Sequence, residues 1–287
     1  MLQRLIWIVL ISLWWVSSAW AGAWNQKEGA LYSKVWLHSV VGGLAYIEAS
    51  PSEPTGGLYI DISLNAYLEY GIVDTFTLLV VGRPVGWGSF NGDSGFNQTA
   101  YTGPIGLGFR WGWLPGRFKL ALEGQYSYAP PLGEVRVGQG TVPSGASWFF
   151  TPTTSSHRLQ AELQAGYGFG FGRGYNGWFA AHAGVRYHTR PSLGTAMLGL
   201  LQLGVSMPFG LVLDLHFNLY LPFEPITTYN ISGAGNTRYI GYGLTASYWF
   251  NRYIAITAAV EGVVLAWANA ATPAIMFGLE FKVPKPQ

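Results

Sequence analysis

Residues 58–71 read LYIDISLNAYLEYG, and apolar and polar side chains alternate through the whole stretch. The apolar set is Ile60, Ile62, Leu64, Ala66 and Leu68. The polar set is Asp61, Ser63, Asn65, Tyr67 and Glu69. Because successive side chains of an extended strand point to opposite faces, this stretch predicts a β-strand with one apolar and one polar face.

The same alternation recurs along the chain and predicts an all-β fold of about twelve strands. Most segments are about 10–14 residues long, which is long for a soluble strand and suits a tilted strand that crosses a bilayer. The expected strands cover residues 29–39, 57–71, 75–84, 101–113, 117–128, 157–171, 177–190, 196–207, 210–221, 237–249, 252–264 and 271–283.

The connections between these segments are alternately short and long. Tight turns are expected at 73–74, 115–116, 172–176, 208–209 and 251. Longer links, rich in Gly, Pro, Ser and Asn, are expected near 40–56, 85–100, 129–156, 191–195, 222–236 and 265–270. Short turns on one rim and longer loops on the other are typical of a transmembrane, antiparallel, up-and-down β-barrel with periplasmic turns and extracellular loops.

The composition of the 287-residue chain favours a barrel over a secreted β-sandwich. Only 10% of the residues are charged, and a sandwich needs far more charge on its solvated faces. The near balance of 16 basic and 14 acidic residues argues against a nucleic-acid partner. The absence of cysteine excludes disulfides, thiolate metal sites and a cysteine nucleophile.

The first 21 residues have the order of a secretory signal peptide. Arg4 supplies a positive charge, an apolar run extends from Leu5 to Val16, and Ala19 and Ala21 form a small-residue cleavage site. The run is too short for a membrane-spanning helix. We therefore expect cleavage after Ala21, export from the cytoplasm, and a barrel domain over residues 22–287.

The two faces of the predicted strands differ in charge. No charged residue lies in the interior of any apolar face, as the cost of a charge facing lipid requires, so the polar faces are expected to surround a lumen. Aromatic residues near segment ends, among them Trp178 and Trp249, are expected to form interfacial girdles. The expected lumen-lining residues are Lys34, Asp61, Glu69, Arg83, Arg110, Lys119, Glu123, Glu162, His182, Arg186, Asp214, His216, Glu261, Glu280 and Lys282.

The last segment reads FGLEFKV from Phe277 to Val283. On this segment and the barrel pattern, the chain resembles the bacterial outer-membrane β-barrel superfamily, with twelve-stranded narrow porins and transporter-like barrels nearest. Gly278, Phe281 and Val283 match the C-terminal signal that the barrel-assembly machinery reads in that superfamily. Phe277 stands where a polar residue is usual, and Pro284–Gln287 extend past the expected end. The resemblance implies a location in the outer membrane.

A catalytic or metal site is not predicted. Lipid hydrolases among such barrels carry a serine two residues from a histidine on one strand face, whereas His188 and His216 are followed at that spacing by Arg190 and Asn218. His182 and His188 lie about 20 Å apart along one strand, so no compact metal-ligand set is visible. No cofactor is expected.

The sequence therefore favours a non-enzymatic channel through which small polar solutes diffuse, with outer-membrane lipid around it. Arg110, Arg186, Asp214 and Glu261 are expected to act as filter residues, while pairing of the lumenal charges as structural bridges stays an alternative. A closed structural or adhesion barrel that displays the 129–156 loop is a second hypothesis, because Trp148, Phe149 and Phe150 could enter the lumen or contact a partner. A lipid-modifying enzyme on the outer wall is a third.

Overall fold

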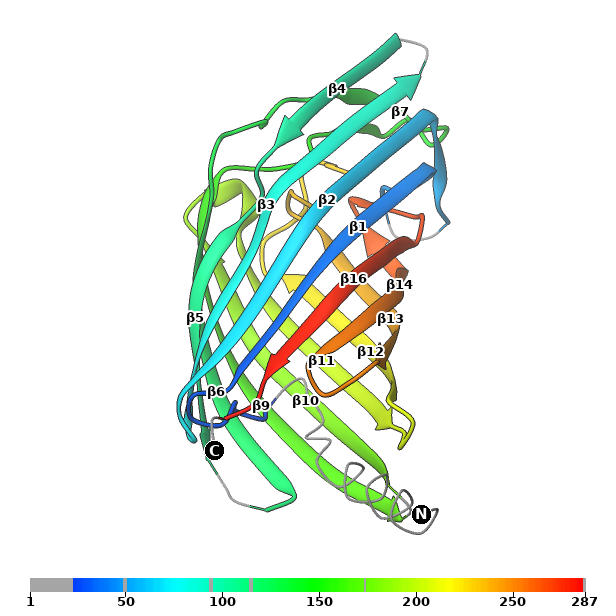
Figure 1. The fold of residues 1–287 in the computed structure, drawn as a ribbon. Coiled ribbons are helices and arrows are strands. Elements are labelled where there is room, and N and C mark those ends of the chain that lie inside the picture. The colour runs from blue at the N-terminus through cyan, green and yellow to red at the C-terminus, as the bar shows by residue number, and fades with distance from the viewer. Residues whose placement is uncertain (1–22, 49–50, 93–94, 114–115, 173, 286–287) are drawn as a thin grey trace, which may run out of the picture.

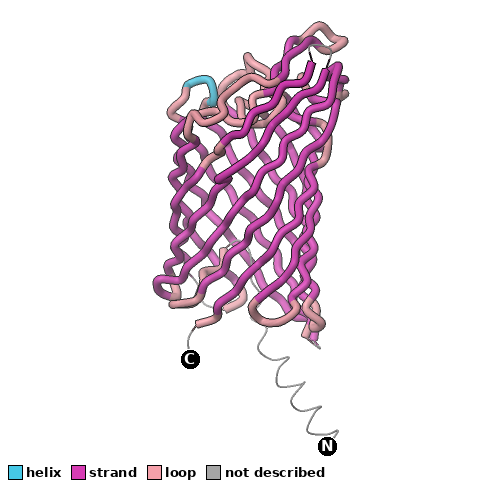
Figure 2. The backbone as a smooth tube through the Cα atoms, turned by 45° about the horizontal axis from the view of Figure 1, so that its top comes forward, coloured by secondary structure: helices cyan, strands magenta, loops and turns pink. Residues whose placement is uncertain are grey.

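The chain forms a closed, tilted β-barrel with both described ends at one rim (Figures 1 and 2). The computed structural model describes residues 23–48, 51–92, 95–113, 116–172 and 174–285. The expected signal peptide lies outside these residues. Among the described residues, no helix has the length and apolar character needed to cross a membrane.

Twelve strands build the barrel wall, as the alternation predicted. They are β1 (Leu31–Tyr46), β2 (Glu53–Val73), β3 (Phe76–Gly92), β4 (Gly95–Tyr101) with β5 (Ile105–Trp113), β6 (Phe118–Ala129), β9 (Ser156–Gly172), β10 (Tyr175–His188), β11 (Thr195–Ser206), β12 (Leu211–Pro222), β13 (Arg238–Trp249), β14 (Ile254–Trp267) and β16 (Ala274–Val283). Strands β4 and β5 both pair with β3 and count as one interrupted strand.

Closure comes from the first and last strands. The register of β1 with β16 runs from Leu31 opposite Val283 to Val40 opposite Ala274, and β1 pairs on its other edge with β2. Every neighbouring pair in the wall is antiparallel. Every described wall strand except β4 has a partner on both edges, as a membrane-spanning sheet requires, and β4 pairs with β3 alone.

The outer face of the barrel is apolar. Leu163, Leu201 and Ile275 are each more than half exposed to the surroundings of the isolated chain. Their sequence neighbours Gln164, Gln202 and Met276 are buried and point inward. The exposed apolar band is the surface that the hydrocarbon of a bilayer covers.

Strands β1–β4 are longer than predicted and rise above the rest of the wall (Figure 1). Residues expected to form loops at 40–56 and 85–100 instead extend the strands from Val40 to Tyr46, from Glu53, and through Gly92 and Gly95. The physical reason is a partner for their inner face: Tyr59 of β2 and Phe90 of β3 are buried against a loop that folds inward.

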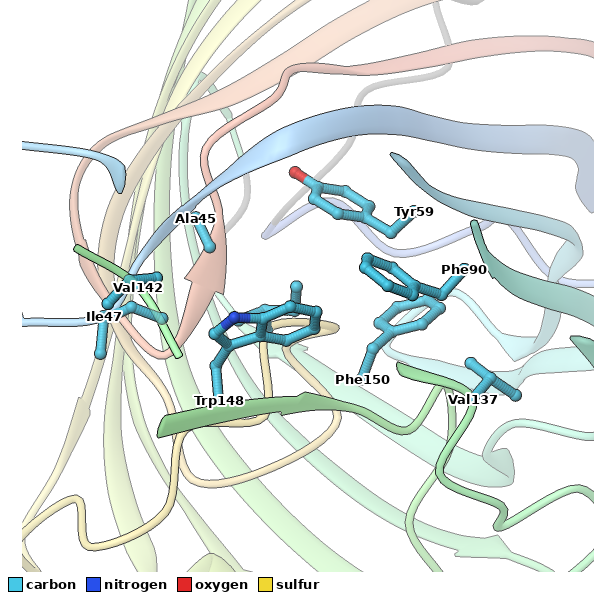
Figure 3. Packing of buried hydrophobic residues seen from close by; sticks show 9 residues of the cluster. Ala45, Ile47, Tyr59, Phe90, Val137, Val142, Trp148 and Phe150 are labelled. Atoms are coloured by element: carbon cyan, nitrogen blue, oxygen red, sulfur yellow. The ribbon is translucent and has the colours of Figure 1, made fainter. Parts of the chain in front are cut away.

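That loop, residues 130–155, crosses the extracellular end of the barrel (green in Figure 1). It contains the hairpin of β7 (Gly138–Thr141) and β8 (Ser147–Phe150). Trp148 and Phe150 pack with Tyr59, Phe90 and Ile231 in the apolar cluster of Figure 3. We call residues 130–155 the extracellular cap.

Two further short elements lie at this end of the barrel. One is η2 (Pro191–Leu193), a single 3₁₀ turn. The other is β15 (Asn269–Ala270), which pairs with the end of β1. Another extracellular connection, residues 223–237, packs onto the cap through the backbone of Asn230 and Phe149. Strands β2, β5, β9, β11 and β13 end where the sequence predicted the tight turns of the opposite rim.

Candidate channel lumen

All fifteen residues expected to line the lumen belong to the inward-facing set of their strands. None of the fifteen is exposed, whereas outward-facing neighbours such as Phe109 and Trp111, on either side of Arg110, are exposed. The structure thus places them inside the barrel. Their part in conduction stays a prediction.

Arg110 of β5 forms the most densely bonded ion cluster of the lumen. Its guanidinium group lies 2.9 Å from a carboxylate oxygen of Glu69 and 2.8 Å from one of Glu123. It also donates to the Tyr67 hydroxyl at 3.2 Å, and Gln164 donates to Glu123 at 3.0 Å. A buried cation held between two carboxylates is a structural bridge rather than a mobile filter charge.

The residues before β1 enter the periplasmic mouth and reach this cluster. Arg110 donates to the backbone oxygen of Trp24 at 3.1 Å, and Gln26 donates its backbone N–H to Thr77 at 2.9 Å and its side-chain amide to Glu69. At the rim, Asp74 accepts the backbone N–H of Glu28 at 3.0 Å. We call residues 23–28 the periplasmic plug.

Glycines on the lumen side make room for the periplasmic plug. A Cβ atom at Gly166 would lie 2.5 Å from the Trp24 ring, and one at Gly112 would lie 2.8 Å from the Asn25 side chain. Any larger residue at these positions would overlap the plug. Gly112 of β5 and Gly166 of β9 therefore form part of the surface on which the plug lies.

His216 of β12 lies between two carboxylates. Its ring nitrogens are 3.3 Å from Asp214 and 3.4 Å from Glu261, and Gln202 donates to Asp214 at 2.6 Å. The ring fits there because Gly243 opposite it has no side chain, since a Cβ at that position would lie 2.3 Å from His216. The two expected filter residues Asp214 and Glu261 are thus brought together by a histidine.

The remaining acidic residues of the lumen also have partners. Glu162 lies 3.3 Å from His182, Glu280 lies 3.8 Å from Lys34, and Ser247 donates to Glu280 at 2.7 Å. Asp61 accepts a hydrogen bond from Tyr101, whose oxygen lies 3.5 Å from the Arg83 guanidinium. Structural pairing, the alternative left open by the sequence, describes most lumenal charges.

Arg186 differs from these residues. Its Nε donates to Gln160 at 2.8 Å, and its guanidinium carbon lies 5.4 Å from the Tyr220 ring centroid. Tyr220 stacks on Tyr239 at 5.7 Å with the ring planes 12° apart. Arg186 is therefore held by a neutral amide and an aromatic wall.

Two cavities lie in the lumen. One of about 330 Å³ is lined by Arg186, His182, Glu162, Tyr220 and the Arg110 cluster. The other, of about 230 Å³, is lined by Arg83, Asp61, His38 and Glu261 and reaches Phe150 of the extracellular cap. Asn218 and Tyr239 line both cavities, so the two spaces adjoin at these side chains.

Sequence reasoning missed two features of this lumen. Arg158 is absent from the expected lumen-lining set, yet it lies on the inward-facing side of β9 with Gln160 and Glu162. The alternation itself could have placed it there. The periplasmic plug has no periodic pattern, and its one signal is the run of lumenal glycines that it fills.

Two expected girdle residues are corrected by the structure. Trp178 is buried on the lumen side of β10 against Gly204, and Trp249 faces inward where the Lys282 ammonium lies 4.8 Å from its ring. Both positions share the parity of the lumenal polar residues on their strands. For these two tryptophans, the position in the strand decides the side of the wall, and the general preference of tryptophan for membrane interfaces does not.

The lumen also joins a serine and a histidine that are distant in sequence. Ser156 Oγ of β9 lies 3.4 Å from His188 Nδ1 of β10, and both residues are buried. The other ring nitrogen of His188 has no hydrogen-bond partner among the described residues, so no carboxylate orients the ring as a catalytic triad needs. Within the described ranges, no three His, Cys, Asp or Glu residues gather to hold a metal.

The residues of the expected assembly signal lie on the closing strand β16. Phe277, Leu279 and Val283 are exposed on the outer face, while Gly278 faces inward with the backbone of Val35 close by. Phe281 opposes Ser33 in the closing register. The alternation of the signal is thus the alternation of a membrane strand.

Comparisons with solved structures support the same architecture. An outer membrane channel from Pseudomonas putida F1 superposes with a TM-score of 0.59 over 93% of this chain and 100% of that one, at 11% identity. This is the fold of an outer-membrane barrel. The translocator domain of the autotransporter NalP from Neisseria meningitidis gives 0.51 at 11% identity, with 88% of each chain covered.

The NanC porin gives a TM-score of 0.49 at 6% identity, over 87% of this chain and 100% of that one. No protein-family profile matches the chain, and no curated protein matches it. The likeness to the Pseudomonas putida channel and to the NalP translocator domain, each at 11% identity, establishes the fold alone. Because one barrel fold serves both channels and translocator domains, function has to be argued from the lumen.

Proposed function

We propose that the protein is an outer-membrane channel through which small polar solutes diffuse. The observation that carries the proposal is the pair of adjoining cavities, lined by charged and polar side chains, inside a barrel whose outer wall is apolar. A barrel built only for mechanical or display purposes has no need of space beside charged lumenal groups, because unfilled polar interiors are costly.

The periplasmic plug and the extracellular cap set the width of the route. Solute entering from outside meets the apolar cluster around Trp148 and Phe150, and solute leaving to the periplasm meets Trp24–Gln26. The channel is therefore narrow, and its conductance depends on displacement of these two segments. Arg186, rather than the ion-paired Arg110, is the filter residue with charge to offer a solute.

Export and assembly complete the proposal. A signal peptide over residues 1–21 directs the chain out of the cytoplasm, and the barrel-assembly machinery reads Gly278, Phe281 and Val283 on β16. Phe281 and Val283 have the outward-facing parity of β16 and point away from the lumen. Loss of the assembly signal should therefore lower the amount of folded protein without changing the conductance of the molecules that do insert.

A closed structural or adhesion barrel is the second candidate, and the two occupied mouths favour it. The deciding experiment is reconstitution of the purified, folded protein into planar bilayers, with current steps recorded over many insertions. Discrete small steps support the channel. Insertion shown by labelled protein without any steps, for both the intact chain and a variant lacking residues 23–28, would contradict it.

A further inference from the structure

Three lumenal arginines lack the counter-charge that the other lumenal ion pairs possess. Among the described residues, no carboxylate oxygen lies within ion-pair distance of Arg83, Arg158 or Arg186. Arg158 of β9 and Arg186 of β10 are neighbours on the lumenal face, because Arg158 pairs with His188 and Arg186 pairs with Gln160 in the register of the two strands, so their positive charges lie close together. Burial of like charges is unfavourable unless a group of opposite sign accompanies them.

The lumenal carboxylates cannot supply that group, because they are committed elsewhere. Glu69 and Glu123 bind Arg110, Glu162 binds His182, Asp214 and Glu261 bind His216, and Glu280 binds Lys34. Asp61 is separated from Arg83 by the Tyr101 hydroxyl. Glu162 is the lumenal carboxylate that lies nearest in effect to Arg186, since Gln160 bonds to both, but Glu162 already pairs with His182. Among the described residues, a directly bonded counter-charge is therefore missing at the three arginines.

The donors of these arginines are also incompletely used. Arg158 Nε is buried and has no hydrogen-bond partner among the described residues. The one hydrogen bond found for Arg186 joins Nε to Gln160. A planar guanidinium group with unused N–H donors binds the two oxygens of an oxyanion.

An apolar surface lies beside the charges. The stacked rings of Tyr220 and Tyr239 line the 330 Å³ cavity together with Arg186, Leu198 and Leu200. An inorganic anion would leave this surface unused. A solute with a carboxylate at one end and a short carbon chain at the other would use both parts.

We propose that Arg158 and Arg186, with Arg83 nearby, form a binding site for a small organic carboxylate on its way through the lumen. The inference rests on the proposed channel and names its solute class. The carboxylate bonds to the two guanidinium groups while the carbon chain lies against Tyr220 and Leu200. It supplies the negative charge that the described residues do not.

Calorimetric titration of the folded barrel in detergent tests the site without requiring conduction. Butyrate is the probe, butyramide is its uncharged counterpart, and inorganic phosphate is the oxyanion without a carbon chain. Butyrate should bind and butyramide should not. Equal binding of butyramide, or phosphate binding as tight as butyrate, would overturn the assignment to a carboxylate.

Substitutions locate the site. Arg158→Gln and Arg186→Gln should each weaken butyrate binding about tenfold or more, since each removes a charge-assisted hydrogen bond. Arg186→Lys should restore part of the loss, because it keeps the charge and loses the planar fork. Arg252→Gln is the matched control, because Arg252 is exposed at the turn after β13 and should leave binding unchanged. Unaltered binding in both lumenal glutamine variants would refute the site.

The unfolding temperature distinguishes a binding arginine from a structural one, because the two roles predict opposite effects of Arg158→Gln. At low ionic strength without butyrate, Arg158→Gln should raise the unfolding temperature, because it relieves repulsion among the three arginines. Butyrate should stabilise the parent protein and not the variant. A lowered unfolding temperature would mean that Arg158 is structural. Absence of bilayer current with intact butyrate binding would refute the channel and leave this site standing.

Discussion

The two mouths of the barrel are occupied by segments of opposite chemistry. At the extracellular end, residues 130–155 bury Trp148 and Phe150 against Tyr59 and Phe90, with the Phe90 and Trp148 ring centroids 5.2 Å apart. At the periplasmic end, residues 23–28 are held by hydrogen bonds to Arg110, Thr77 and Asp74. One closure rests on the removal of apolar surface from water, and the other rests on polar contacts.

The difference predicts different responses of the two ends. Apolar packing is insensitive to the charge state of its members, whereas polar contacts change with protonation. The periplasmic plug is also imperfectly satisfied, because both polar atoms of the Asn25 amide are buried without a hydrogen-bond partner in the described chain. An unsatisfied buried amide lowers the stability of the docked state. The periplasmic mouth should therefore open more readily than the extracellular one.

The largest expected effect is at the apolar end. Trp148→Ala removes the largest ring of the extracellular cap and should cost about 3–5 kcal/mol of cap docking. External protease acting on reconstituted protein should then cut within residues 130–155, while the barrel stays resistant. Leu132→Ala, a change at a 61% exposed position of the same loop, is the control and should leave the loop protected. Equal cleavage of the two variants would show that the apolar cluster does not hold the extracellular cap in place.

A smaller effect is expected at the polar end. Gly166→Val places a side chain where the Trp24 ring lies and should destabilise plug docking by about 1–3 kcal/mol. The single-channel current step should increase, while the gel mobility of the unheated protein stays that of a folded barrel. Gly170→Val is a matched control on the same strand and face, because the nearest atom to its Cβ would be 3.7 Å away. A current step unchanged in both variants would show that the plug does not limit the route.

Acid should loosen the periplasmic plug. The backbone N–H of Glu28, and next Lys27 and Lys285, lower the pKa of the Asp74 carboxyl group. A lowered folded pKa means that the contact is fully present above the pKa of an ordinary aspartate and is lost as the pH falls through the lowered value. The current step should therefore grow below about pH 4. Asp74→Asn should abolish that pH dependence, and its persistence in the variant would assign the transition to another group.

The weakest expected effect is at the extracellular end and has the opposite pH dependence. Tyr229, in the loop that packs on the cap, donates to Glu48 at 2.7 Å, and this bond raises the pKa of the phenol. The bond is complete below the pKa of an ordinary tyrosine and is lost as the pH rises through the raised value. Protease protection of residues 223–237 should decline in that alkaline range, and Tyr229→Phe should lack the decline. Equal alkaline loss in both proteins would contradict this origin.

The strand order and the inward-facing set could be predicted because both depend on local alternation. A period of two fixes which side of the wall each residue occupies, so Asp214 and His216 could be placed inside and Leu215 outside without knowledge of any partner. The same rule would have placed Arg158 and Trp178 inside. Trp178 and Trp249 were misplaced because residue type was given more weight than parity, and Arg158 was left out because it stands at the start of its strand.

The two closures could not be predicted because they depend on docking between distant parts of the chain. The contacts of Trp24 with Gly166 and of Trp148 with Phe90 join residues whose sequence positions carry no common period. The partners of Arg110 depend on which strands become neighbours and on their stagger, and the sequence did not give that stagger. The extra height of β1–β4 followed from the same docking, since the extracellular cap covers their inner faces.

The attachment of the periplasmic plug to β1 has a consequence for ligand competition. Gly29, with a positive φ of 72°, and its N–H bond to Gly71 place the hinge directly beside the seat of the plug. Six residues can reach at most about 20 Å, so an undocked plug stays near the mouth. A short flexible tether gives an effective concentration of about millimolar. A soluble peptide with the sequence of residues 23–28, added at micromolar concentration, is therefore outcompeted by the protein's own segment. For the same reason, contacts too weak to bind a free peptide are sufficient to keep the mouth occupied.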